Sequence, residues 1–96
     1  MTVWIKQGVL GNLSPPMRRC KGRLVALYAS YGFDFFITSL REGNHHPASC
    51  HYEGEALDFK RQNIPMIEII SECGDGFDVV EYDDERNIFH VEYDPK

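Results

Sequence analysis

The chain has 96 residues, of which 43% are hydrophobic and 26% charged, and its formal net charge at pH 7 is -5. This length suits one domain with one small core, so we interpret residues 1–96 as a single domain and exclude a multidomain enzyme and a disordered tail. The apolar runs are too short for a membrane span, and the acidic balance argues against nucleic-acid binding. We therefore expect neither a membrane nor a nucleic acid as a partner.

The first predicted element is a helix that begins after Ser14 and ends at Gly32. Ser14 precedes two prolines and suits an N-cap, and Gly32 suits a left-handed C-terminal cap. Between them, apolar residues recur at helical spacing, at Met17, Cys20, Leu24, Leu27, Tyr28 and Tyr31. Four basic residues are interpreted as a solvated helix face, with an RNA or protein contact as the alternative: Arg18, Arg19, Lys21 and Arg23.

Strands are predicted at four places farther along the chain. Residues 33–39 are rich in aromatic and β-branched residues and predict a buried strand. Residues 55–59 predict a short strand whose side chains alternate between two faces. Leu57 and Phe59 are expected to face the core, and Ala56 and Asp58 the opposite side. Residues 77–82 and 88–93 predict a β-hairpin around the polar turn 83–87.

A second helix is predicted between residues 63–65 and Gly74, with an apolar side formed by Ile67, Ile70 and Cys73. The predicted order is therefore helix, strand, strand, helix, strand, strand. This order indicates an α+β domain in which two helices pack on a small, mostly antiparallel sheet.

The cysteines and the first residues bear on the compartment. The chain has three cysteines, an odd number, and no C-x-x-C motif: Cys20, Cys50 and Cys73. We therefore expect a reducing compartment and no disulfide framework. The first eight residues lack the charged and apolar regions of a signal peptide. We expect synthesis in a cytoplasm without a signal peptide.

The candidate chemistry centres on His51, Asp58 and His90. Because Asp58 faces away from the core residues, its carboxylate must be solvated, paired or bound to a metal. Two histidines and one carboxylate from separate elements can hold Zn²⁺ and leave a fourth position open for water. The alternative is a surface histidine and a strand aspartate in a salt bridge. His45 and His46 are interpreted as loop residues near the rim of the cleft, not as ligands.

A catalytic site of this kind also needs a general base close to the water. If Asp84 pairs opposite Asn87 in the hairpin, Glu81 lies directly across from His90 on the same face of the sheet. A register shifted by one residue would break this arrangement. Asp84 or Glu85 would then be the better candidate, although both also fit a solvated turn.

The residues Ser49, His51, Gly54, Ala56 and Asp58 fit the pattern Ser-x-His-x-x-Gly-x-Ala-x-Asp, and a later strand contains His-Val-Glu. Together these motifs resemble the zinc-dependent D,D- and L,D-peptidases of the M15 type. That family includes D-alanyl-D-alanine carboxypeptidases and bacteriophage endolysins, and the zinc-binding domain of hedgehog signalling proteins is similar. The resemblance runs from about residue 33 to the end of the chain.

The resemblance implies a hedgehog/DD-peptidase-like fold in which His51, Asp58 and His90 are zinc ligands. Arg41 would stabilise the oxyanion or bind a substrate carboxylate, and an acidic residue of the hairpin would be the base. The implied activity is hydrolysis of peptide bonds in peptidoglycan stem peptides, after release of the protein to the cell wall. The alternative is a catalytically weak or inactive zinc-binding structural or interaction module, such as a viral or phage accessory protein.

Overall fold

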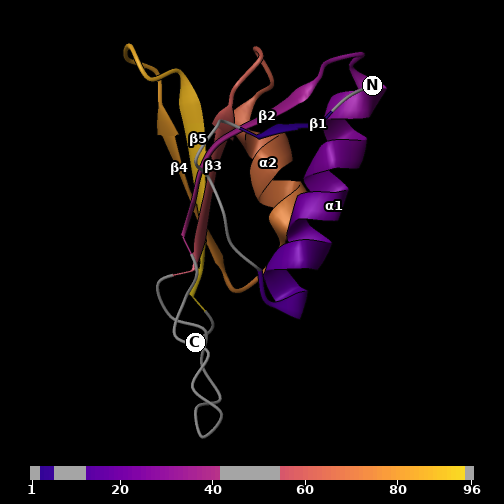
Figure 1. Cartoon of the computed structure of the whole chain (residues 1–96), viewed down its shortest axis with the longest axis vertical. Coiled ribbons are helices and arrows are strands. Elements are labelled where there is room, and N and C mark those ends of the chain that lie inside the picture. The colour runs from indigo at the N-terminus through magenta and orange to yellow at the C-terminus, as the bar shows by residue number, and fades with distance from the viewer. Residues whose placement is uncertain (1–2, 6–12, 42–54, 95–96) are drawn as a thin grey trace, which may run out of the picture.

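The structure is a computed structural model that describes residues 3–5, 13–41 and 55–94 (Figure 1). Its elements in chain order are β1 (Val3–Ile5), α1 (Pro15–Ser30), β2 (Phe35–Arg41), β3 (Ala56–Lys60), α2 (Met66–Cys73), β4 (Phe77–Tyr82) and β5 (Ile88–Tyr93). Both predicted helices are present, and the hairpin strands have the predicted bounds. The strand β1 has no counterpart in the sequence prediction, while β2 and β3 are shifted toward the C-terminus by two residues and one residue.

The strands form one five-stranded sheet in the order β1-β2-β3-β5-β4. All neighbouring strands are antiparallel except β1, which runs parallel to β2. The predicted α+β class, with two helices and a mostly antiparallel sheet, is therefore confirmed. Because β5 pairs with both β4 and β3, the hairpin brings the last strand beside β3 in the middle of the sheet.

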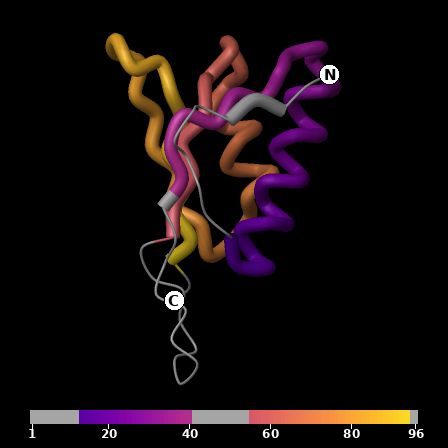
Figure 2. The backbone as a smooth tube through the Cα atoms, viewed as in Figure 1, coloured from indigo at the N-terminus to yellow at the C-terminus, as the bar shows by residue number. Residues whose placement is uncertain are grey.

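Both helices cover the same face of the sheet, as the ribbon and the backbone tube show (Figures 1 and 2). The side chains between the helices and the sheet form the core, whose members include Met17, Cys20, Leu24, Tyr28, Phe35, Ile37, Leu57, Phe59, Ile69, Phe89 and Val91. The opposite face of the central strands is covered by neither helix. Polar residues that alternate with the core residues of β3 and β5 are directed to that face.

The start of α1 is held by a buried carboxylate from another element. Ser14 occupies the predicted N-cap position, yet its side chain makes no capping hydrogen bond. Instead, the backbone N–H of Ser14 donates to Oε1 of Glu55 at 2.6 Å. Glu55 directly precedes β3, and its backbone oxygen accepts from the N–H of Tyr93 at the end of β5. This contact therefore ties the first turn of α1 to the strands β3 and β5.

The apolar side of α2 differs from the prediction. Cys73 is buried as expected, but Ile67 and Ile70 are 69% and 43% exposed. The helix is turned so that Ile69 and Cys73, four residues apart, face the core together. The prediction was wrong at Ile67 and Ile70 because this short helix has two adjacent apolar pairs, Met66-Ile67 and Ile69-Ile70, which define more than one possible apolar stripe. Among the described residues, no helix has the length and apolar character needed to cross a membrane.

Candidate functional site

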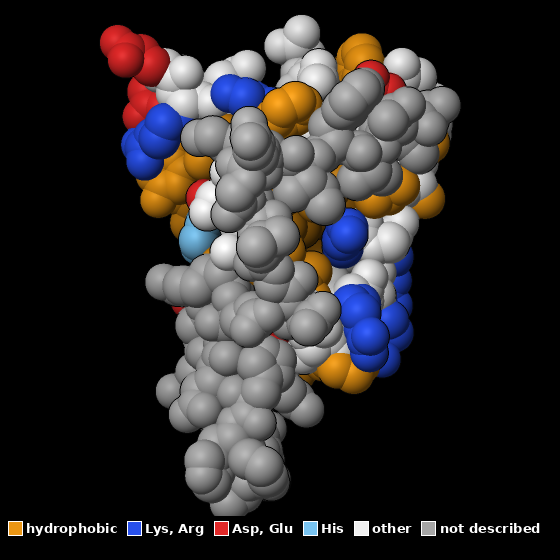
Figure 3. Space-filling view, in the orientation of Figure 1, with side chains coloured by type: hydrophobic (Ala, Val, Ile, Leu, Met, Phe, Trp, Pro, Cys, Tyr) orange, Lys and Arg blue, Asp and Glu red, His pale blue; other side chains and the backbone are white. Residues whose placement is uncertain are grey.

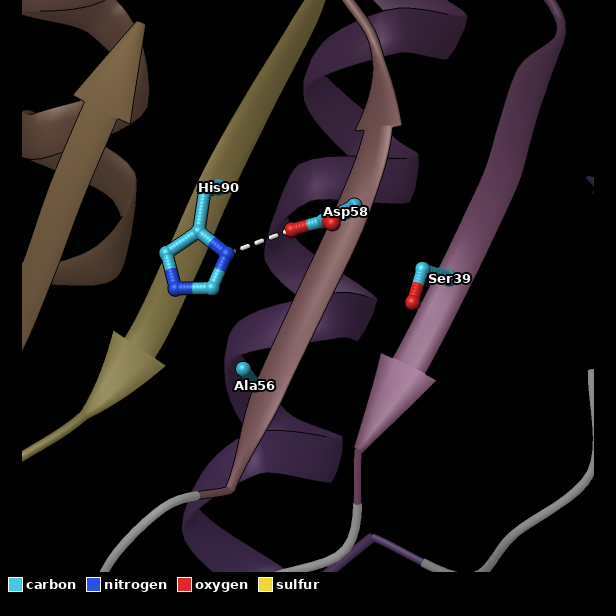
Figure 4. Close-up of a pocket in the computed structure, with 4 residues that line it drawn as sticks. All are labelled: Ser39, Ala56, Asp58 and His90. Carbon is cyan, nitrogen blue, oxygen red and sulfur yellow. Dashed lines mark hydrogen bonds and ion pairs between the residues drawn. The ribbon is translucent and has the colours of Figure 1, made fainter.

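Asp58 of β3 and His90 of β5 form a side-chain pair on the sheet face that the helices leave uncovered (Figure 4). The two residues are direct partners in the antiparallel register. Nδ1 of His90 lies 2.5 Å from Oδ1 of Asp58, within hydrogen-bond distance. This pairing follows from the alternation of the two strands, since Leu57, Phe59, Phe89 and Val91 all face the core.

The pair borders a small hollow that is open to the surface. Its lining residues are Ser39, Ala56, Asp58 and His90, and its volume is about 140 Å³. Ser39 is the partner of Asp58 in the β2–β3 register, so that three strands contribute to the hollow. The small side chain of Ala56 leaves space beside the pair, as the close-up shows (Figure 4). The side chains of His90 and Asp58 are 26% and 22% exposed, which lets a small ligand reach them.

Glu92 extends the cluster along β5. Its Oε1 lies 3.6 Å from Nε2 of His90, and its side chain is 31% exposed. Glu92 is the last residue of the His-Val-Glu motif, and the sequence analysis predicts no role for it. The sequence contains the information needed to place Glu92 beside His90, because residues two apart on a strand share a face. The structure thus brings two carboxylates to the two ring nitrogens of one histidine.

The donor chemistry of this pair is compatible with zinc. Imidazole nitrogen and carboxylate oxygen are ordinary zinc ligands. On one tetrahedral zinc they lie about 3.3 Å apart, as follows from usual bond lengths. A change of less than about 1 Å in the separation of Nδ1 and Oδ1 would therefore convert the pair into two ligands. A carboxylate that instead keeps its bond to Nδ1 fixes the ring and leaves Nε2 to the metal.

Two further residues, Arg41 and His51, are expected near the metal, and only Arg41 belongs to the described residues. Arg41 is the last residue of β2, and its backbone pairs with Ala56, next to the hollow. His51, the third expected ligand, lies outside the described residues. Within the described ranges, no three side chains of His, Cys, Asp or Glu are arranged to hold a metal ion. Of the three residues expected to bind zinc, Asp58 and His90 lie side by side in the described part of the chain.

Glu81 does not face His90, so the expected register is wrong by one residue. In the hairpin, Val80 pairs with His90, and Glu81 pairs with Phe89. Glu81 therefore lies on the helix side of the sheet, where its Oε2 is 3.2 Å from Nε of Arg61. The prediction that Glu81 is a base opposite His90 depended on that register and is wrong.

The acidic residues of the turn are exposed and close to one another. Asp84 accepts hydrogen bonds from the side chain and the backbone N–H of Arg86, and its Oδ2 lies 2.6 Å from Nη2 of that arginine. These hydrogen bonds, with the positive charge, lower the pKa of Asp84 to about 2. Asp84 is thus held as an ionised partner of Arg86. Glu85 is exposed beside it, so a role for either as base stays a prediction.

Comparisons with known proteins give no match: no protein-family model fits the chain, and no curated protein or solved structure is significantly similar to it.

Proposed function

We propose that this protein is a zinc-dependent peptidase that cleaves peptide bonds in peptidoglycan stem peptides. The observation that carries the proposal is the pairing of Asp58 with His90 at the open hollow, at 2.5 Å between Oδ1 and Nδ1. These residues are 32 positions apart, and the sequence motifs alone make both of them candidate ligands. With His51 they would hold the metal, and the resemblance of the sequence motifs gives the substrate class.

When bound, zinc supplies Lewis acidity, which polarises the scissile carbonyl and favours ionisation of water. The chain's own contribution is to hold the ligands in place and to accept a proton. Glu92 suits the second task, because it shares the face of His90 and is partly exposed. We therefore propose Glu92, in place of Glu81, as the general base. Arg41, at the end of β2, stays the proposed group for the oxyanion or a substrate carboxylate.

The test is hydrolysis of purified peptidoglycan and of peptides that end in D-Ala-D-Ala, with zinc present and products identified by mass spectrometry. We expect cleavage by the native protein and a loss of about 100-fold or more in kcat for Glu92→Gln, with zinc content unchanged. Glu81→Gln is the matched control, since Glu81 lies on the opposite face of the sheet. Equal activity of Glu92→Gln and the native protein would exclude Glu92 as the base.

A second candidate function is a zinc-binding interaction module without hydrolytic activity. The position of Glu81 favours it, because the carboxylate first expected to act as the base is paired with Arg61 on the helix side. Full zinc occupancy without cleavage of any of these substrates would select this function. Cleavage that depends on zinc and on His90 would exclude it.

A further inference from the structure

Two of the three cysteines of the chain meet in the core although they are far apart in the sequence. Cys20 lies on the buried side of α1, and Cys73 is the last residue of α2. Their sulfur atoms are 3.1 Å apart, and the two positions are separated by 53 residues. Both thiols are free in this structure. The contact thus joins the two helices at a point where they pack against each other.

We propose that Cys20 and Cys73 are a modification site: a dithiol that closes reversibly to a disulfide linking α1 to α2. The sulfur atoms of a disulfide are about 2.05 Å apart, so closure requires an approach of about 1 Å between side chains already in contact. This site is separate from the pair Asp58 and His90, and the inference does not depend on the proposed peptidase function.

A surface hollow reaches the edge of this pair at Cys73, whereas Cys20 is fully buried behind it. Cys73 lines a surface hollow of about 290 Å³, which it shares with Pro16, Arg19, Arg23, Gly74 and Asp75. Lys and Arg side chains gather over α1 beside this region (Figure 3). The hydrogen bond shared with Cys73 and the charge of Arg23 lower the pKa of Cys20, while burial opposes this effect. The same shared hydrogen bond raises the pKa of Cys73. These opposite shifts favour ionisation of Cys20 over Cys73, and the thiolate is the form of cysteine that reacts with peroxide.

The proposed oxidant is hydrogen peroxide. The first thiolate attacks a peroxide oxygen, and the O–O bond breaks to give a sulfenic acid and hydroxide, which takes up a proton to become water. The sulfur of the second cysteine then attacks the sulfenic sulfur, and its S–O bond breaks to release a second water. In total, two thiols lose two electrons and two protons, and one peroxide becomes two waters. A thiol reductant reverses the change by thiol–disulfide exchange.

The test uses the full chain with one equivalent of hydrogen peroxide, followed by free-thiol titration in denaturant. We expect the count to fall from three thiols to one, and to return to three after reduction. Tryptic digestion separates the three cysteines into residues 20–21, 42–60 and 62–86. The linked product must join residues 20–21 to 62–86. Because the bridge closes a long loop, the melting temperature should rise by roughly 10 °C on oxidation.

Matched variants separate this pair from the third cysteine. Cys50→Ser must keep the linkage, and Cys73→Ser must lose it. Mapping of the native chain needs no variant, so the test stands even if Cys73→Ser fails to fold. Three thiols that persist after peroxide, a linkage that includes Cys50, disulfides between two chains, or oxidation to sulfinic acid without a linkage would each overturn the proposal.

Discussion

Tyr28 is the residue that joins α1 most directly to the end of β3. It is fully buried, and its ring makes edge contacts with Phe35 and Phe59, at centroid distances of 5.0 and 5.8 Å. Its hydroxyl donates to the backbone oxygen of Lys60 at 2.7 Å and lies 3.2 Å from that of Arg61. One side chain therefore combines aromatic packing with a hydrogen bond to the sheet.

We predict that Tyr28→Phe lowers the free energy of unfolding by about 1–2 kcal/mol, since the packing stays but a buried carbonyl loses its donor. Urea denaturation measures the change. Tyr31→Phe is the matched control, because Tyr31 is 43% exposed and should change stability far less. A Tyr28→Phe variant as stable as the native protein would show that the hydroxyl contributes nothing.

The same residue predicts a dependence on alkaline pH. Burial raises the pKa of Tyr28 above its usual value of 10.0. A group whose pKa is raised on folding contributes stability that is complete below the pKa of the unfolded state and is lost as the pH rises above it. Unfolding free energy should therefore fall from about pH 10 upward. Tyr28→Phe should reduce this loss of unfolding free energy, which denaturation at pH 8, 10 and 11 measures. A pH profile that is the same in the variant and the native protein would contradict the prediction.

The candidate site shows which side chains can be predicted one by one from the sequence. The face of Asp58 follows from alternation with its buried neighbours, and this prediction is consistent with the observed pairing with His90. The cross-strand partner of Glu81 could not be predicted, because it depends on the geometry of the turn. Asn87 adopts a positive φ of 51° and closes the turn in a register one residue away from the one considered.

At the scale of elements, α1 contains a glycine whose effect on the free energy of unfolding can be measured. Gly22 lies within the helix, is exposed, and has open space where a Cβ would be. We predict that Gly22→Ala raises the free energy of unfolding by about 0.5–1 kcal/mol, since alanine loses less backbone entropy in a helix.

Gly32 is the matched control for this substitution in α1. It follows the same helix with a φ of +77°, where an L side chain is strained. Gly32→Ala should therefore lower the free energy of unfolding by about 1 kcal/mol or more. Thermal denaturation of both variants tests the pair, and shifts of the same sign would contradict the prediction.

The first turn of α1 gives a second prediction at this scale. Among the described residues, Oγ of Ser14 is buried without a hydrogen-bond partner, whereas the backbone N–H of Ser14 donates to Glu55. Ser14→Ala should thus change stability by less than about 0.5 kcal/mol, below the usual cost of removing an N-cap. Glu55→Ala should cost about 1–3 kcal/mol, because a buried N–H loses its acceptor. Chemical denaturation that ranked the two variants in the opposite order would refute this assignment.

The helices also show the limits of prediction at this scale. The ends of α1 are marked by Ser14, Pro15 and Gly32, which act locally, and its bounds agree with the prediction. The facing of α2 depends on its packing against α1 and β4, which no local pattern encodes. Its buried residues are Ile69 and Cys73, while Ile67 is largely exposed.

At the scale of the whole molecule, a chain of 96 residues has a small core, and its free energy of unfolding is expected to be small. A metal that binds only the folded protein adds to its stability by mass action. Because binding and folding are then linked, loss of one ligand should lower zinc affinity and the melting temperature together. This coupling distinguishes a metal site from a simple ion pair between Asp58 and His90.

The central claim is that His51, Asp58 and His90 hold one zinc ion, and the most direct measurement is metal content. Protein purified without chelator is analysed by elemental mass spectrometry, with melting curves before and after EDTA treatment. We predict about one zinc per chain, a lower melting temperature after chelation, and recovery when zinc is added. His51→Ala, Asp58→Ala and His90→Ala should each lose the metal, while His45→Ala should keep it. A native protein that contains no zinc and does not respond to added zinc, or a His51→Ala variant with full metal content and an unchanged melting temperature, would contradict the claim.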